Sequence, residues 1–231
     1  MRIGSGPRPL EVEYGGLPLI KRQHLSAQRG SYADGVSARI EAEPRADEVA
    51  WLQRAILVLV SPRDVFAAMR DDSDAGAGPR SEAVLALVFL SGIASVLWAP
   101  KYGTLLDDVA NDGLNVAVIA FIGGALYGAL GYFLGGLVVY GHMRAFGGLT
   151  FRQARHVLAF ASAPIALSLF VVWPVRLAVY GQDVFRSGGA DHGAGNAAFI
   201  ALELVFVGWS LALLVIGLHA VLRREPALER L

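Results

Sequence analysis

Four long stretches without a charged residue constrain this chain more than any other feature of its sequence. Residues 83–100, 113–143, 157–175 and 204–222 contain no Asp, Glu, Lys or Arg. A helix needs about 20 mostly apolar residues to cross a bilayer core about 30 Å thick. Helices buried in soluble proteins rarely run so long without a charge. The pattern therefore predicts an all-α integral membrane protein rather than a soluble helical domain.

The composition agrees with this fold class and excludes others. Hydrophobic residues make up 55% of the chain and charged residues only 17%, against about 25% charged in soluble domains. The 20 basic and 20 acidic residues cancel, so we exclude a nucleic-acid binder driven by net charge. Since the chain contains no cysteine, it has no disulfide framework and no thiolate nucleophile.

The spans predict a bundle of four or five transmembrane helices preceded by short amphipathic cytoplasmic helices. We expect the spans at about residues 83–100, 114–141, 157–179 and 197–222, between a disordered N-terminal tail (1–45) and a C-terminal tail (223–231). Pro164 and Pro174 interrupt the third span and leave a fifth crossing open. One kinked span is favoured, because two full crossings do not fit in about 24 residues.

The loop charges predict the orientation of the bundle. Basic residues in short loops mark the cytoplasmic side of a membrane. The loop 143–156 has three arginines and no acid, whereas the loop 101–112 has one lysine against three aspartates. Residues 1–45 contain no apolar run typical of a secretory signal peptide. We expect a multi-pass protein of the cell (inner) membrane with both termini in the cytoplasm.

Residues 46–82 predict amphipathic juxtamembrane helices. Their apolar residues recur at helical spacing, as at Val49, Leu52, Ile56 and Leu59. Ser61, Pro62 and Asp64 then fit the N-cap, N1 and N3 positions of a second helix. These helices either lie on the cytoplasmic leaflet or pack against the bundle, and the two arrangements are compatible.

The second span carries small residues along one helix face. They are spaced three or four residues apart and are Ala117, Ala120, Gly124, Gly128, Gly131 and Gly135. In lipid, helices attract each other through the close packing that small residues permit. The stripe favours an intramolecular bundle contact. A homo-oligomer face is the second interpretation, and a glycine-lined solute pathway is the third.

The segment between the second and third spans contains a turn and a helix start. Gly147 and Gly148 supply the turn, and Thr150 with Gln153 forms the pattern of a capping box. The helix that follows begins amphipathic, and Pro164 is expected to kink it at the membrane.

These residues resemble the Yip-domain family, named after membrane proteins that interact with Ypt/Rab GTPases. The resemblance rests on the order of LVSPRDVF (59–66), GGLTFRQ (147–153), AFASAP (159–164) and the run from Trp209 to Leu218. It covers about residues 52–222 and implies an integral membrane domain, usually with five spans and without catalytic residues. Eukaryotic relatives are implicated in vesicle trafficking through Rab-type GTPases.

The residue usage indicates the bacterial branch of this family. The chain has 18 arginines to 2 lysines and is rich in alanine and glycine, which is typical of a GC-rich bacterial genome. A Rab-binding role is therefore not transferred to it.

The search for chemistry in the sequence gives one candidate. The five histidines have no metal-site spacing, and neither a P-loop nor a dinucleotide fingerprint is present, so we expect no enzyme, metal or cofactor. Glu203 lies about seven residues into the fourth span, where a central acid costs about 2.5–3.5 kcal/mol. The favoured interpretation is a structural carboxyl that pairs with Arg176 or another span. The other is a proton or cation site.

Two functions remain. The first is a non-enzymatic membrane scaffold or adaptor, with the lipid bilayer, an unidentified cytoplasmic protein and a second copy as candidate partners. The alternative is a small membrane transporter or ion pathway that uses Glu203.

Overall fold

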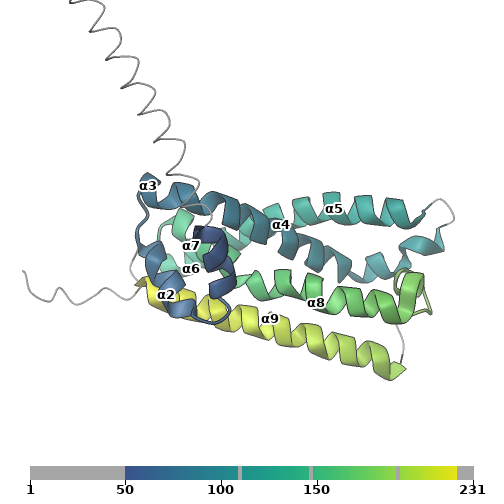
Figure 1. Cartoon of the computed structure of the whole chain (residues 1–231). Coiled ribbons are helices and arrows are strands. Elements are labelled where there is room, and N and C mark those ends of the chain that lie inside the picture. The colour runs from purple at the N-terminus through teal and green to yellow at the C-terminus, as the bar shows by residue number, and fades with distance from the viewer. Residues whose placement is uncertain (1–49, 109–110, 146–147, 191–192, 223–231) are drawn as a thin grey trace, which may run out of the picture. The chain divides into compact units, whose positions relative to one another are not determined.

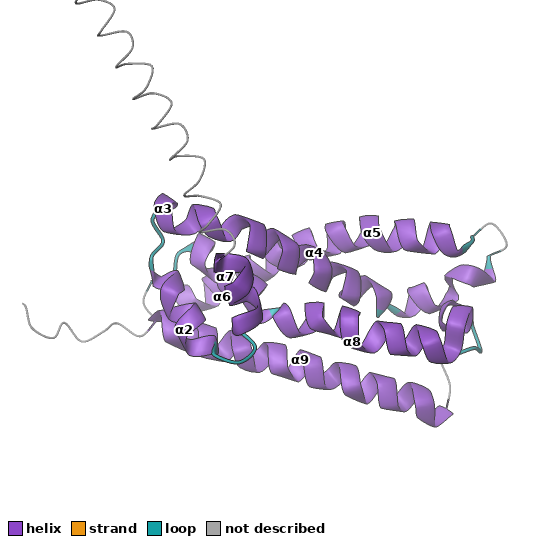
Figure 2. Cartoon of the chain, viewed as in Figure 1, coloured by secondary structure: helices purple, strands orange, loops and turns teal. Residues whose placement is uncertain are grey.

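A computed structural model of the chain describes residues 50–108, 111–145, 148–190 and 193–222, all within one compact unit, residues 45–231. The predicted tails, residues 1–45 and 223–231, lie outside the described residues. Within the described ranges, all regular elements are helices, joined by loops and turns (Figure 2). The prediction of an all-α fold is confirmed.

The part of the chain that the structure describes holds four helical stretches long and apolar enough to cross a membrane: Asp74–Leu97, Gly113–Arg144, Phe151–Phe185 and Gly193–Leu222. They contain, in order, α4 (Ser81–Leu97); α5 (Gly113–Leu130), the π-helical turn η4 (Gly131–Gly135) and α6 (Gly136–Arg144); α7 (Phe151–Ala161) and α8 (Ala163–Tyr180); and α9 (Gly193–Leu222). Many large apolar side chains on these helices, such as Phe121 and Leu126, are exposed. Such a surface suits lipid rather than water.

Short elements lie at both ends of the bundle. Helical residues 50–57 are followed by α2 (Pro62–Ala67), η1 (Ala68–Arg70), α3 (Asp74–Ala77) and η2 (Gly78–Arg80). At the other end, η3 (Pro100–Asp107) contacts η5 (Gly181–Phe185). We call these the α2 end and the η3 end of the bundle (Figure 1). Ser61 occupies the N-cap position of α2 without a side-chain hydrogen bond, and Pro62 lies in its first turn.

The third helical stretch changes from α7 to α8 at Ser162. Pro164 follows in the first turn of α8, where its missing N–H costs least, and it is fully buried. Pro174 lies inside α8, which nevertheless continues to Tyr180. Residues 151–185 therefore form one interrupted stretch rather than two crossings.

The largest buried cluster lies toward the α2 end and joins the short elements to the long helices. It includes Trp51, Phe66, Met69, Phe160 and Leu213. The rings of Trp51 and Phe160 meet edge to face at 5.7 Å. The juxtamembrane segment is therefore packed into the core of the bundle.

Candidate functional site

The turn before α7 has the local structure that its sequence predicts. Thr150 Oγ1 accepts a hydrogen bond from the Gln153 backbone N–H, and Gln153 Oε1 accepts one from the Thr150 backbone N–H, both at 3.1 Å. Gly148 has a φ of +106°, which favours glycine. Gly147 lies outside the described residues. The turn thus gives α7 a fixed first residue and direction.

The first turn of α7 also binds the segment before α3. Arg152 Nε donates to Asp72 Oδ1 at 2.8 Å, and its Nη1 donates to Asp74 Oδ1 at 2.6 Å. Its Nη2 donates to the Asp72 backbone carbonyl. Thr150 Oγ1 donates to Asp72 Oδ2 at 2.6 Å. The guanidinium therefore binds two carboxylates and a carbonyl that are about 80 residues away in the sequence.

Two further side chains bind the backbone carbonyls of the same segment. Gln153 Nε2 donates to the Arg70 carbonyl at 3.1 Å. Arg80 Nη1 donates to the Met69 carbonyl at 3.4 Å, and Nη2 donates to the Asp71 carbonyl. The chain becomes extended at Asp71 after η1, so carbonyls there need partners from outside a helix. We call the set Thr150, Arg152, Gln153, Arg80, Asp72 and Asp74 the clasp.

Arg80 is fully buried, and aromatic stacking accompanies its hydrogen bonds. Its guanidinium lies 5.3 Å from the centre of the Trp51 ring, and Arg54 lies 4.5 Å from the same ring. A buried guanidinium is tolerated only when hydrogen bonds and favourable contacts replace its hydration. Arg80 therefore links helical residues 50–57, the clasp segment and α4.

The loop that the clasp holds has its own carboxylate hydrogen bond. The Ser73 backbone N–H donates to Asp71 Oδ1 at 3.0 Å. This hydrogen bond, with the Ser73 side chain, holds the pKa of the Asp71 carboxyl below its ordinary value of 3.8. Ser73 also caps α3, since its Oγ accepts from the Gly76 N–H at 3.1 Å. These hydrogen bonds thus fix the conformation of residues 71–76, which precede α4 in the chain.

Beneath the clasp, α2 packs against α9 through a glycine. A Cβ atom added to Gly217 would lie 2.9 Å from both the Phe66 ring and Val157 Cγ1. Phe66 is fully buried in the resulting contact. A side chain at position 217 would therefore force Phe66 or Val157 to shift.

One face of the segment before α2 remains open. Ile56 is 70% and Val60 81% exposed, while Trp51 and Val58 are buried. The segment consequently packs against the bundle on one side and presents apolar groups on the other.

The small residues of the second stretch pack mainly against α4. A Cβ on Gly124 would lie 2.8 Å from the Ile93 backbone, and one on Gly128 would overlap the Val88 carbonyl. In return, a Cβ on Gly92 of α4 would overlap the Gly124 carbonyl. This contact lies within one chain.

The remaining residues of the small-residue face have different surroundings. Ala120 is buried beside Val116, whereas Ala117 is exposed. Gly131 has no neighbour within 4 Å of an added Cβ, and Gly135 faces Leu158 at 2.8 Å. The π turn η4 lies between them and is wider than an α-helical turn. Before this turn the second stretch packs against α4, and after it the stretch packs against α7. There, an added Cβ on Gly136 would meet Arg155.

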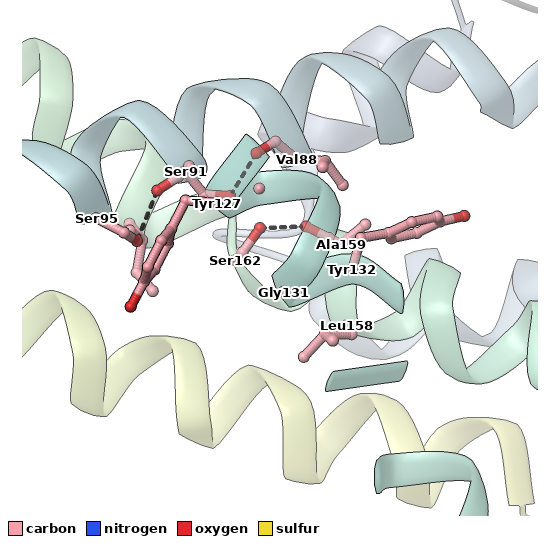
Figure 3. Close-up of a pocket in the computed structure, with 12 residues that line it drawn as sticks. Val88, Ser91, Ser95, Tyr127, Gly131, Tyr132, Leu158, Ala159 and Ser162 are labelled. Atoms are coloured by element: carbon pink, nitrogen blue, oxygen red, sulfur yellow. Dashed lines mark hydrogen bonds between the residues drawn. The ribbon is translucent and has the colours of Figure 1, made fainter. Parts of the chain in front are cut away.

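A cavity of about 170 Å³ lies where α4, the π turn and the α7–α8 junction meet (Figure 3). Its polar lining comes from Ser91, Ser95, Ser162 and the two tyrosines Tyr127 and Tyr132. The serine hydroxyls donate to carbonyls of their own helices: Ser95 to Ser91 at 2.8 Å and Ser162 to Ala159 at 2.7 Å. The cavity therefore contains no aligned nucleophile and base, and the described residues hold no group of three metal-ligating acids or histidines.

Glu203 lies in the contact between α9 and α8, with 6% of its surface exposed. Ser168 and Arg176 of α8 are the polar groups that act on its carboxyl. Arg176 in turn donates to Asn196 Oδ1 at 3.3 Å and lies 5.3 Å from the Trp173 ring centre. The carboxyl of Glu203 therefore has polar groups of α8 as neighbours.

Sequence reasoning missed the partners of the clasp. In the sequence alone, Asp72 and Asp74 resemble the polar end of a helix. Arg80 resembles a charged residue that flanks the first membrane span. The only available signal is the opposite charge of the segments 71–74 and 152–155, which does not specify pairing.

Comparison with known proteins places the motif turn and its surroundings in one family. The family model described as the Yip1 domain matches residues 56–228, which are 173 of the 231 residues. The matched range includes the clasp, the four long helices and Glu203. Searches of curated proteins and of solved structures gave no match to this chain.

Proposed function

Because the chain belongs to the Yip1 domain family, and is a multi-pass membrane protein, we propose that it is a non-enzymatic scaffold or adaptor. The family consists generally of non-enzymatic membrane trafficking proteins. Residue usage supports its bacterial branch, and the inner membrane is the corresponding location. The clasp carries the proposal, because it holds a short polar module, residues 62–80, at a fixed place on the membrane bundle.

The distribution of charge supports a cytoplasmic location for this module. Arg63, Arg70 and Arg152 belong to the α2 end, whereas Asp107 and Asp183 belong to the η3 end. Basic residues favour the cytoplasmic side. With four spans, both termini then face the cytoplasm.

A labelling experiment tests this orientation. The chain contains no cysteine, so Ala68→Cys or Thr104→Cys introduces the only thiol at an exposed position of either end. In cells whose outer membrane has been removed and whose inner membrane is intact, a membrane-impermeant maleimide should label the Thr104→Cys variant. Ala68→Cys should react only after permeabilisation, and the reverse pattern would contradict the orientation.

Copurification in mild detergent tests the scaffold role. Wild type and Arg152→Gln should be compared, with Arg186→Gln at the η3 end as the matched control. A protein partner that is retained by wild type and the control, and lost from Arg152→Gln, is the expected result. Retention by wild type and both variants would contradict a role for the clasped module.

The transporter alternative draws no support from the surroundings of Glu203. Its carboxyl faces Ser168 and Arg176 rather than lining the cavity of Figure 3. On the small-residue face, Gly124 and Gly128 pack against α4, whereas Ala117 is exposed and Gly131 has open space around it.

A further inference from the structure

A groove of about 480 Å³ lies between α2 and the last turns of α9, where the two helices contact each other (Figure 1). Its polar lining comprises Arg63, Asp64, Arg70 and His219. Its apolar lining comprises Ala67, Val215, Ile216 and Ala220. None of these lining residues belongs to the set defined as the clasp.

The charges of the groove favour an anion. The described residues that line the groove include two guanidinium groups and one carboxylate, so these lining residues together carry a net positive charge. Arg70 Nε donates to the Ala220 carbonyl at 3.0 Å, which holds this guanidinium against the end of α9. Arg63 is exposed and forms no ion pair with any residue of the described ranges. Guanidinium groups bind phosphate oxygens in a bidentate manner.

The position of the groove favours a lipid rather than a dissolved anion. Val215 is 67% exposed, and Leu211, one turn earlier on α9, is 59% exposed. These apolar groups lie on a helix long enough to cross a membrane. A basic groove at the end of such a helix is placed at the level of lipid headgroups, where basic pockets between helices bind anionic lipids.

We propose that this groove binds an anionic phospholipid, with its phosphate between Arg63 and Arg70 and an acyl chain along Val215 and Leu211. His219 donates a further hydrogen bond, and Asp64 accepts from a headgroup hydroxyl. The bound lipid would fasten α2 to α9 beneath the clasp. This proposal holds whichever end of the bundle faces the cytoplasm.

Lipid titration of the full chain in detergent tests the proposal. Phosphatidylglycerol should raise the thermal unfolding midpoint, and native mass spectrometry should show retained lipid. Phosphatidylcholine and phosphatidylethanolamine should bind at least about fivefold more weakly, as should glycerol 3-phosphate, which lacks acyl chains. Equal effects of either zwitterionic lipid would overturn the anionic selectivity, and an equal effect of glycerol 3-phosphate would overturn the lipid assignment.

Variants test the residues. Arg63→Gln should weaken phosphatidylglycerol binding about fivefold, and Arg63→Gln with His219→Gln should weaken it further. Arg63 and His219 are exposed, so neither change should disturb the fold. Arg186→Gln, an exposed arginine at the η3 end, is the matched control and should bind as wild type does. Unchanged binding by the double variant would overturn the proposal.

Discussion

Arg152 Nε lies 2.8 Å from Asp72 Oδ1, although the two residues are 80 positions apart in the chain. The contact joins the first turn of α7 to the loop before α3, and Thr150 and Gln153 reinforce it from the same turn. A family-motif turn between two membrane helices therefore also binds the juxtamembrane segment.

A double-mutant cycle should reveal this coupling. Arg152→Gln and Asp72→Asn should each lower the thermal unfolding midpoint in detergent. The double variant should be less destabilised than the sum of the two, because each single change removes the same contact. Additive effects would show that Arg152 and Asp72 do not stabilise the fold through each other.

Arg80→Met should destabilise the protein more than a surface change does. The substitution leaves the Asp71 carbonyl without the Arg80 donor and the Met69 carbonyl with only the Gln153 Nε2 donor at 3.5 Å, and we expect a loss of about 2–4 kcal/mol. Unfolding in mixed detergent micelles measures the effect. Arg186→Gln serves as the control, and a similar small effect of both would contradict the role of Arg80.

Gly92→Ala should weaken the contact between α4 and α5. The added Cβ overlaps the Gly124 carbonyl, which is backbone and cannot rotate away. We expect a cost of about 1–3 kcal/mol. Gly208→Ala in α9 is a matched control with open space around its Cβ, and its effect should stay under about 1 kcal/mol. Equal stability of the two variants would contradict close packing at Gly92.

Because of Tyr102, we expect the stability of the η3 end to decrease at alkaline pH. Its phenol is buried and donates to the Val116 carbonyl, and burial raises its pKa to about 12. A raised pKa means that the folded state holds the proton more tightly, so this stabilisation is complete below pH 10 and declines as the pH rises toward 12. The thermal midpoints of wild type and Tyr102→Phe should differ at neutral pH and converge in this range. A constant difference up to pH 12 would contradict the assignment.

The Glu203→Gln variant should fold as wild type does, and neither protein should conduct protons. The amide can still accept hydrogen bonds from α8, so stability should change by less than about 1 kcal/mol. Proteoliposomes of wild type should show no proton flux above empty vesicles. A flux that disappears in Glu203→Gln would support the transporter alternative instead.

The four long helices could be predicted because a bilayer imposes a minimum length on any apolar span. Local structure was also readable where it depends on neighbours in sequence, as in the hydrogen bonds between Thr150 and Gln153. Both signals lie within about 30 consecutive residues and need no knowledge of the tertiary fold.

The remaining structure depends on contacts that no local pattern specifies. The residues buried on α5, Val116, Ala120, Gly124 and Gly128, repeat every four positions, whereas the predicted face mixed steps of three and four and included Ala117. The π turn at Gly131–Gly135 then changes the helix partner. The clasp is still less predictable, since many arginines could meet Asp72 and only the fold selects Arg152.

Hydrogen exchange on the full chain in lipid nanodiscs tests the clasp most directly. The account predicts that backbone amides of residues 69–76 are protected in wild type and exchange at least about tenfold faster in Arg152→Gln. Amides in the middle of α4 and α9 should stay unchanged in both. Equal exchange of residues 69–76 in the two proteins would show that the motif turn does not hold the juxtamembrane module, and the scaffold proposal would lose its structural basis.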